Sequence, residues 1–276
     1  MSAPSSIRFS RAYWDAAADT YEQDFTSTVV GQLLRAAVWR ELECIFSRGQ
    51  RILELNCGTG LDAVHLAERG LRVLACDVSQ RMIELARQRA STSELRQKID
   101  FRVLATEELG VLFSEGPFDG AFSNFSGLNC VENLAEVRKN LSHLIKPGGS
   151  AVLCMLGCFV PWEILWFLAR GDGSKAMRRF QSQSAFCPQS GALKVYYRSK
   201  SEITSLFMPE FRLRKWKGIG IAVPPPYLER WVRRFPNFTK ALDQADRLLG
   251  GLAIFRNMSD LVLLEFEHRG TMPGRQ

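Results

Sequence analysis

The chain has 276 residues, of which 46% are apolar and 24% are charged. This length is sufficient for one large domain with a sizeable core, and the apolar fraction excludes a disordered or collagen-like chain. The formal net charge of +7 is uneven, because residues 1–150 carry 17 Lys or Arg against 19 Asp or Glu, whereas residues 151–276 carry 19 against 10. The second half is therefore expected either to present a solvated basic face or to meet an anionic partner.

Several features bear on where the protein is located. The seven scattered cysteines form no C-x-x-C pair and no zinc-like array, which indicates reduced thiols and a cytoplasmic location. The first 14 residues contain no signal-peptide run and no lipidation motif. Residues 151–169 are apolar enough to suggest a membrane span, but Gly157, Pro161 and Glu163 interrupt them. A buried strand followed by an apolar helix explains this stretch better, so no transmembrane segment is expected.

In chain order, residues 12–47 are predicted to be helical, because they carry apolar side chains at three-to-four spacing. A short apolar strand at 51–55 follows and ends in the glycine-rich loop 56–60, after which a helix continues to Gly70. Further strands alternate with helices and are expected at 72–76, 99–104, 118–123 and 150–156. This alternation predicts an α/β fold with a doubly wound, mostly parallel sheet that is covered by helices on both faces.

After residue 157 the alternation stops, and residues 158–192 are expected to form an inserted helical cap. The remaining elements are predicted as a helix at 199–208, a strand at 211–223, a helical segment at 227–250 and a closing strand at 259–267. The sheet is therefore expected to have about seven strands, with the last one antiparallel.

The loop after the first strand and the end of the second strand predict a nucleoside-binding site. Ligands of open α/β sheets bind outside the carboxyl ends of the strands. Gly58 and Gly60 let the loop backbone approach a ligand closely, and Asp77 ends the second strand, where a carboxylate can accept hydrogen bonds from both ribose hydroxyls. The loop lacks the third glycine of a dinucleotide fingerprint, and Asp62 places a negative charge where a pyrophosphate would bind.

At this point the sequence resembles the class I S-adenosylmethionine-dependent methyltransferases of the small-molecule type. The resemblance rests on four motifs in the family's order, and it covers about residues 10–156; the motifs are Ile52–Gly60, Asp77–Met82, Phe118–Phe125 and Leu144–Gly149. It implies a Rossmann-like methyltransferase fold, S-adenosylmethionine as the cofactor and S-adenosylhomocysteine as its product. It also implies one domain, with residues 1–47 as the lid, 48–157 as the cofactor-binding half, 158–192 as the cap and 193–276 as the completion of the sheet.

The resemblance also assigns cofactor contacts by position. Glu54, Gly58 and Gly60 would face the methionyl chain, and Asp77 would hold the ribose hydroxyls. A side chain at Gly58 or Gly60 is therefore expected to obstruct the ligand more than it disturbs the core. The rest of the predicted cofactor set would enclose the adenine, line the loop or lie beside the methionyl end, and consists of Tyr21, Asn56, Cys57, Val78, Met82, Ala105, Thr106, Ser123 and Asn124.

Two positions depart from the family's pattern. Asn56 stands where a glycine is usual, and asparagine tolerates a positive φ better than most residues. Ala105-Thr106 stands where many members offer an aspartate to the adenine amino group. Adenine recognition is therefore expected to rest on backbone groups and Thr106.

The expected acceptor is a small molecule with an apolar body. The candidate substrate residues are aromatic and comprise Tyr13, Phe159, Trp162, Trp166, Tyr196 and Tyr197. The basic residues Lys175, Arg178 and Arg179 follow the aromatic start of the cap and would suit an anionic group on the substrate, or a membrane face that supplies one. Plain packing beneath a solvated basic helix is the alternative.

No catalytic residue and no metal site is predicted, because a sulfonium methyl is already activated and mainly needs alignment with its acceptor. Three other functions stay open, namely RNA or DNA methylation, cofactor binding without turnover in an interaction protein, and nicotinamide-dependent oxidation. The basic half favours the first of these, but the sequence has no base-flipping motif or recognisable nucleic-acid module, so nucleic acid is not the expected partner.

Overall fold

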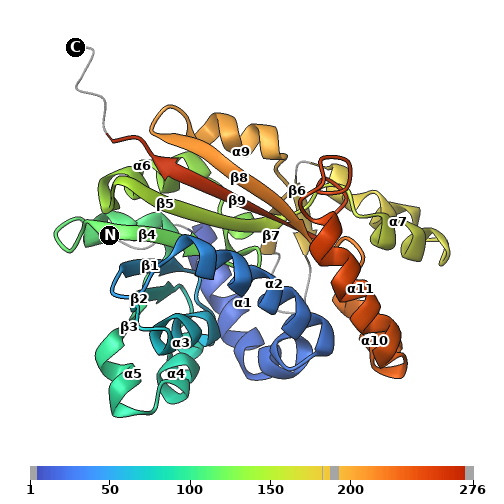
Figure 1. Ribbon diagram of the computed structural model, residues 1–276, viewed down its shortest axis with the longest axis horizontal. Helices are drawn as coiled ribbons and strands as arrows, with labels where there is room; N and C mark the ends of the chain where they lie inside the picture. The colour runs from blue at the N-terminus through green and yellow to red at the C-terminus, as the bar shows by residue number, and fades with distance from the viewer. Residues whose placement is uncertain (1–4, 182, 187–192, 271–276) are drawn as a thin grey trace.

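A seven-stranded sheet forms the centre of the computed structural model, which describes residues 5–181, 183–186 and 193–270 (Figure 1). The strand order is β3-β2-β1-β4-β5-β9-β8, and only β9 runs antiparallel to its two neighbours. The predicted doubly wound, mostly parallel sheet with an antiparallel last strand is thereby confirmed. The strands are β1 (Arg51–Leu55), β2 (Arg72–Asp77), β3 (Ile99–Val103), β4 (Phe118–Ser123), β5 (Ile145–Leu156), β8 (Phe211–Ile219) and β9 (Leu261–His268).

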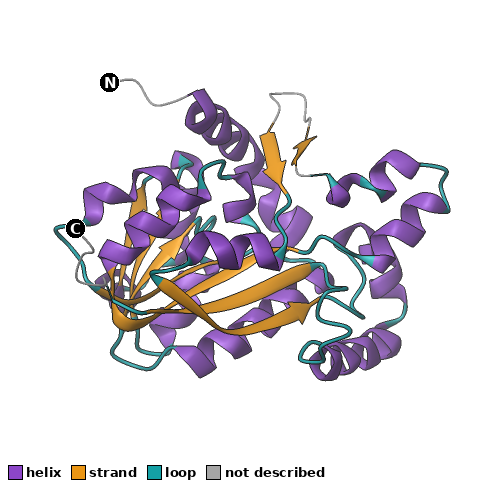
Figure 2. Ribbon diagram, turned by 90° about the horizontal axis from the view of Figure 1, so that it is seen from above, coloured by secondary structure: helices purple, strands orange, loops and turns teal. Residues whose placement is uncertain are grey.

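Helices cover both faces of this sheet, as Figure 2 shows from above. On one face lie α2 (Val29–Ile45), α3 (Leu61–Glu68) and α4 (Gln80–Arg89). On the other lie α6 (Leu134–Leu144), α9 (Lys200–Phe207) and the 3-10 turn η2 (Thr106–Leu112). The short helix α5 (Ser93–Lys98) leads into β3. Strands covered on both faces need apolar side chains in succession, which is why the central strands are apolar runs in the sequence.

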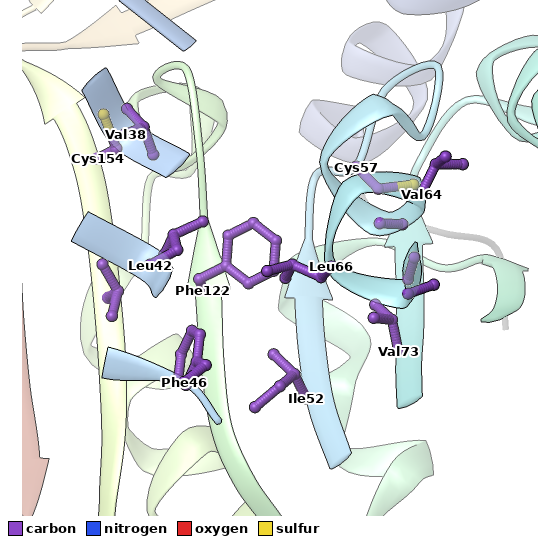
Figure 3. Close-up of a cluster of buried hydrophobic side chains, with 14 of the residues drawn as sticks. Val38, Leu42, Phe46, Ile52, Cys57, Val64, Leu66, Val73, Phe122 and Cys154 are labelled. Atoms are coloured by element: carbon purple, nitrogen blue, oxygen red, sulfur yellow. The ribbon is translucent and has the colours of Figure 1, made fainter. Parts of the chain in front are cut away.

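The packing of α2 on the sheet is central to the position of the site. Figure 3 shows Phe122 of β4 between Leu42 of α2 and Leu66 of α3, with Phe46 below them. Burying such side chains contributes about 1.5–3 kcal/mol each. This contact fixes α2 against the ends of the strands, where its N-terminal half reaches the pocket described below.

The N-terminal segment is helical as predicted, but it is interrupted. It consists of α1 (Ser5–Tyr21), a π-helical turn η1 (Glu22–Thr26) and α2. The side chain of Thr28 caps α2 by accepting a hydrogen bond from the backbone N–H of Gly31, and such a cap starts a new helix. The expected continuous helical stretch 12–47 is therefore two helices joined by a turn.

Helix α1 is held against the start of α4. Asp15 accepts hydrogen bonds from the Ser79 hydroxyl at 2.5 Å and from the Arg81 backbone N–H at 3.1 Å. Arg11 donates to the backbone carbonyl of Val78 at 3.1 Å. These contacts place α1 over the carboxyl ends of the strands.

The predicted cap, residues 158–192, is helical only in its first part. The segment forms α7 (Pro161–Leu168), α8 (Gly173–Ala176) and the 3-10 turn η4 (Arg178–Phe180), and then the strand β6 (Gln183–Phe186). β6 pairs antiparallel with β7 (Leu193–Tyr196), and strand formation there depends on a partner that a local pattern does not show. Residue 182 and residues 187–192 of the predicted cap lie outside the described residues.

The C-terminal elements follow the predicted order with shorter bounds. β8 ends at Ile219 rather than at residue 223, because Gly220 turns the chain with a φ of 74°. The helical segment predicted at 227–250 consists of the 3-10 turn η5 (Pro226–Leu228), α10 (Glu229–Arg234) and α11 (Pro236–Leu249). Pro236 has no N–H for a continuing helix, so α11 begins there. Among the described residues, none of the helices has the length and apolar character that crossing a bilayer requires.

Candidate functional site

A pocket lies beneath α1, at the carboxyl ends of β1, β2 and β4. Its envelope, including the open mouth, contains about 810 Å³ of space not filled by atoms. This is the edge at which open α/β sheets bind ligands. Most of the predicted cofactor residues line it, namely Tyr21, Asn56, Cys57, Gly58, Asp77, Val78, Met82, Thr106 and Asn124.

Asn56 holds the ends of three strands together. Its backbone has a φ of 55°, which fulfils the expectation that an asparagine here adopts a positive φ. Its amide donates to the Thr106 hydroxyl at 2.9 Å and accepts from the Ser123 hydroxyl at 3.1 Å. Asn56 therefore replaces the usual glycine and also links the loop to the ends of β3 and β4.

The two loop glycines have different roles. Gly58 lines the pocket with a φ of 53°, and a Cβ there would have no described heavy atom within 4 Å. Gly60 lies outside the lining, and a Cβ there would lie 2.7 Å from the Ala86 Cβ and 2.9 Å from the Phe101 ring. The expectation that a side chain at Gly60 obstructs the ligand more than it disturbs the core is therefore wrong, because the adjacent core leaves no room for one.

Asp77 presents a buried, positioned carboxylate. One oxygen accepts from the backbone N–H of Gly58 and the other from that of Ser79, both at 2.9 Å. Burial raises the pKa of Asp77 to about 6, and the two backbone hydrogen bonds oppose that rise. Each carboxylate oxygen can accept more than one hydrogen bond, so both still have lone pairs for hydroxyl donors.

Arg35 of α2 also lines the pocket, and the sequence analysis missed it. It is 6% exposed, it donates to Asp62 at 2.6 Å, and its guanidinium lies 4.4 Å from the centre of the Phe125 ring. Its Nε has no hydrogen-bond partner among the described residues. The sequence does contain a signal for this position. Arg35 lies about one helical turn from Gly31 and from Val38, on the face of α2 that is buried.

Asp62 is similarly fixed by contacts distant in sequence. Its carboxylate accepts from Arg35, from the Trp39 indole at 2.7 Å and from the Asn124 amide at 2.9 Å. The negative charge noted in the sequence is thus neutralised by Arg35. Asn124, placed beside the methionyl end by the resemblance, lines the pocket and holds this carboxylate in position.

Tyr21 lines the same end of the pocket as Arg35. Burial raises the pKa of its phenol to about 12, although the Arg35 charge and hydrogen bond oppose the rise. The hydroxyl is therefore protonated at neutral pH and can donate a hydrogen bond.

The remaining predicted cofactor residues lie behind the lining. Glu54 is 1% exposed, and its Oε2 has no hydrogen-bond partner among the described residues. Burial and the nearby Asp62 raise the pKa of Glu54 well above its usual range. Ala105 packs with Ile7 and Val78 beside the pocket. The lining also includes residues that were not predicted as site residues, among them Trp14 of α1, Glu107 of η2 and Phe125.

None of the six aromatic substrate candidates belongs to the described lining. Tyr13 is near the lining residue Cys130, which together with burial raises the pKa of the Tyr13 phenol. Trp166 lies 3.2 Å from the Arg170 guanidinium and stacks on Tyr227 at 5.8 Å, which is a packing role within the α7 region. The other candidates, Phe159, Trp162, Tyr196 and Tyr197, are also outside the lining, so their contact with substrate stays a prediction.

The expectation that Arg178 and Arg179 face an anionic substrate is wrong for Arg179. Arg179 is 8% exposed and donates to Glu163 at 2.8 Å and to Asp260 at 2.6 Å. It also donates to the backbone carbonyls of Gly157 and Asp260. Arg178 pairs with Glu163 at 2.7 Å. These cations hold the α7 region on the sheet, because two buried carboxylates require them.

Comparison with known proteins agrees with this geometry. Residues 52–149 match the family model described as a methyltransferase domain. A demethylmenaquinone methyltransferase of Clavibacter sepedonicus is 32% identical over 148 residues, which cover 52% of this chain and 56% of that protein. A tRNA 5-carboxymethoxyuridine methyltransferase of Escherichia coli K12 is 28% identical over 140 residues, with 49% and 53% covered. The chain thus spans about half the length of these curated relatives.

The similarity in fold to solved structures extends over more of the chain than the similarity in sequence to these relatives. The solved structure of magnesium protoporphyrin IX methyltransferase from Synechocystis PCC 6803, with bound SAH, has a TM-score of 0.58 at 14% identity. That likeness covers 95% of this chain and 99% of the other. Residues 52–149 therefore match a methyltransferase domain, and the chain around them has the seven-stranded fold of a solved methyltransferase structure.

Proposed function

We propose that this chain transfers a methyl group from S-adenosylmethionine to a small-molecule acceptor with an apolar body. The observation that carries the proposal is the pocket in which Gly58, Asp77, Met82 and Arg35 meet beneath α1. It brings a carboxylate, an apolar side and a cation together in one pocket.

These groups fit a nucleoside with an amino-acid tail. The Asp77 carboxylate is an acceptor for ribose hydroxyls, and Val78 and Met82 provide apolar surface for the adenine. The loop at Gly58 leaves space that a Cβ would take, so a ligand chain can pass close to the backbone. The Nε of Arg35, with no partner among the described residues, suits a carboxylate at the methionyl end.

The lining at the end of β3 offers two polar groups for the adenine. Thr106 and Glu107 both line the pocket where many family members have an aspartate. The Thr106 hydroxyl already accepts from Asn56, whereas burial raises the pKa of Glu107. Glu107 is therefore a second candidate for the adenine amino group beside the predicted Thr106.

When bound, the cofactor supplies an electrophilic methyl group on a sulfonium. The residues of this chain have to orient that end and exclude water, for which Trp14 of α1 and Phe125 provide apolar surface. The phenol of Tyr21, with a pKa of about 12, can hold a ligand oxygen as a hydrogen-bond donor. It is a poor general base at neutral pH, because almost none of it is deprotonated.

The part of the chain that forms the pocket does not favour a polyanionic acceptor. Residues 1–150 carry two more acidic than basic side chains, and nucleic-acid sites are usually marked by clustered cations. The anionic group first expected on the acceptor was assigned to Arg178 and Arg179, which are bonded to Glu163 and Asp260 instead. We therefore retain only the apolar body in the proposal.

Two measurements test the proposal, first of cofactor binding and then of methyl transfer. By calorimetry, S-adenosylmethionine should bind and NAD should not. Asp77→Ala should weaken binding by roughly 2–4 kcal/mol, about 30-fold or more, because two charge-assisted hydrogen bonds are lost. Asp100→Ala, which removes an exposed acid of β3, is the matched control and should leave affinity unchanged.

Labelled cofactor incubated with lipid-phase and aqueous metabolite extracts should then yield a methylated small molecule. Binding of NAD, or an unchanged affinity of a folded Asp77→Ala variant, would contradict the assignment of the site. Tight cofactor binding with no labelled product in either extract would favour an interaction protein without turnover.

A further inference from the structure

Helix α11 is amphipathic, and its polar side faces the protein. Its buried residues are Thr239, Asp243 and Asp246. Its outward side carries Phe238, which is 52% exposed, and Leu248, which is 76% exposed. A surface helix normally buries its whole apolar stripe, whereas α11 leaves Phe238 and Leu248 exposed and buries Leu242 and Leu249 only in part.

The inward polar residues have defined partners that fix this orientation. The Asp246 carboxylate accepts from the backbone N–H groups of Gly220 at 3.1 Å and Ala222 at 2.9 Å, in the turn after β8. The Thr239 hydroxyl donates to the backbone carbonyl of Val232 at 3.0 Å. Turning the apolar side inward would break these buried hydrogen bonds, at a cost of about 1–3 kcal/mol for each group left unpaired.

The chain that follows α11 extends the apolar surface. Leu252, Ile254 and Phe255 are exposed, Ile254 to 77%. Figures 1 and 2 both show α11 and the segment leading to β9 at the same end of the molecule. Single exposed apolar side chains need no explanation, whereas a cluster of them marks an interaction surface.

The same segments present unpaired positive charge. Arg230 and Arg234 of α10 and Lys240 of α11 are exposed and form no ion pair with any residue that the structure describes. The acidic groups nearby are turned inward, since Asp246 bonds to the backbone and Glu229 accepts from the N–H of Val29 at 2.8 Å. The exposed side chains of α10, α11 and residues 252–255 therefore include both apolar and cationic ones.

We propose that the outward side of α11 together with residues 252–255, here the α11 surface, docks on an anionic lipid bilayer. Apolar side chains would enter the boundary between headgroups and acyl chains, while Arg230, Arg234 and Lys240 would meet anionic headgroups. A second copy of this chain fits less well, because a symmetric interface would bring the same cations together. This proposal goes beyond methyl transfer and does not depend on it.

Vesicle sedimentation tests the proposal. The protein should bind vesicles of phosphatidylcholine with phosphatidylserine more strongly than vesicles of phosphatidylcholine alone, and added salt should reduce the difference. Leu248→Glu combined with Ile254→Glu should lower vesicle affinity by about tenfold or more per side chain. Val111→Glu, at an equally exposed apolar residue of η2, is the matched control and should have no effect.

A second variant tests the charges separately. Arg234→Gln combined with Lys240→Gln should lower affinity for the anionic vesicles about fivefold per charge and leave phosphatidylcholine binding unchanged. The melting temperature and the cofactor affinity of all variants should match those of the original protein, since these side chains are exposed and distant from the pocket lining.

Two results would overturn the proposal. One is equal binding of the original protein and the double glutamate variant to anionic vesicles, or no binding by either. The other is a dimer in lipid-free sedimentation equilibrium that the double glutamate variant converts to a monomer, because the α11 surface would then be a contact between two copies of the chain.

Discussion

Asp77 combines burial with a proposed role, binding of ribose hydroxyls, that requires negative charge. Its folded pKa of about 6 lies above the value of about 3.9 expected in an unfolded chain. The folded state therefore holds the proton more tightly, and this group makes folding less favourable as the pH rises from about 4 to about 6. The opposite trend applies to ligand binding, because ribose hydroxyls need the ionised carboxylate as their acceptor.

Cofactor affinity should accordingly fall as the pH drops below about 6, approaching tenfold per pH unit. Calorimetry with S-adenosylmethionine across this range measures the effect. Asp77→Asn should bind weakly with a nearly flat pH profile, since its amide does not titrate there. An original protein whose affinity is constant from about pH 5 to about pH 8 would refute this role of the carboxylate.

Gly58 and Gly60 provide a comparison of two adjacent roles. Both have positive φ, so an alanine costs about 1–2 kcal/mol of stability at either position. Gly58→Ala should lose cofactor affinity with little further destabilisation, because its Cβ would enter open pocket space. Gly60→Ala should lose a further 1–3 kcal/mol or so, because its Cβ would collide with Ala86 and Phe101. Urea unfolding and calorimetry of both variants measure the two effects, and the reverse ranking in stability would contradict the packing role of Gly60.

At the scale of elements, one buried cation joins three parts of the chain. Arg179 of η4 bonds to Glu163 of α7 and to Asp260, which precedes β9. Burial alone would raise the pKa of Glu163, but the hydrogen bond from Arg178 and the charge of Arg179 outweigh it and lower that pKa. The stability from this ion pair is therefore present at neutral pH and decreases as the pH falls through the lowered pKa.

Arg179→Met should destabilise the protein by about 3–5 kcal/mol, because it leaves the buried Asp260 without its cation and the buried Glu163 with Arg178 alone. Lys175→Met is the matched control, since the pair of Lys175 with Asp172 is exposed and contributes about 0–1 kcal/mol. Urea unfolding at neutral pH compares the two variants. If both substitutions lowered the free energy of unfolding by an equally small amount, Arg179 would not be required to hold the α7 region on the sheet.

At the scale of the whole molecule, the uneven charge is distributed among several roles. Part of the basic half neutralises acids from the first half, as when Lys215 and Lys217 of β8 both bond to Glu41 of α2 at 2.8 Å. Burial would raise the pKa of Glu41, but these two lysines lower it. Another part, Arg178 and Arg179, is bonded near the sheet. A third part includes Arg230, Arg234 and Lys240 of α10 and α11, which face outward without ion pairs among the described residues.

The sequence by itself determined the features that depend on neighbouring residues. The bounds of β1 and β4 were predicted correctly, because buried parallel strands are apolar runs closed by turn residues. The place of Gly58 and Asp77 in the pocket followed from the same local patterns, since the carboxyl ends of neighbouring parallel strands meet at one edge.

The tertiary structure decided what depends on partners far apart in the chain. Gly60 is a packing position because Phe101 lies beside it, and Arg35 enters the pocket because Asp62 balances its charge. Phe238 and Leu248 of α11 face outward because Asp246 accepts hydrogen bonds from the backbone after β8, which lies 24 or more residues away in the chain. Desolvation, close packing and ion pairing depend on distances in space, and the period of a sequence contains no information about those distances.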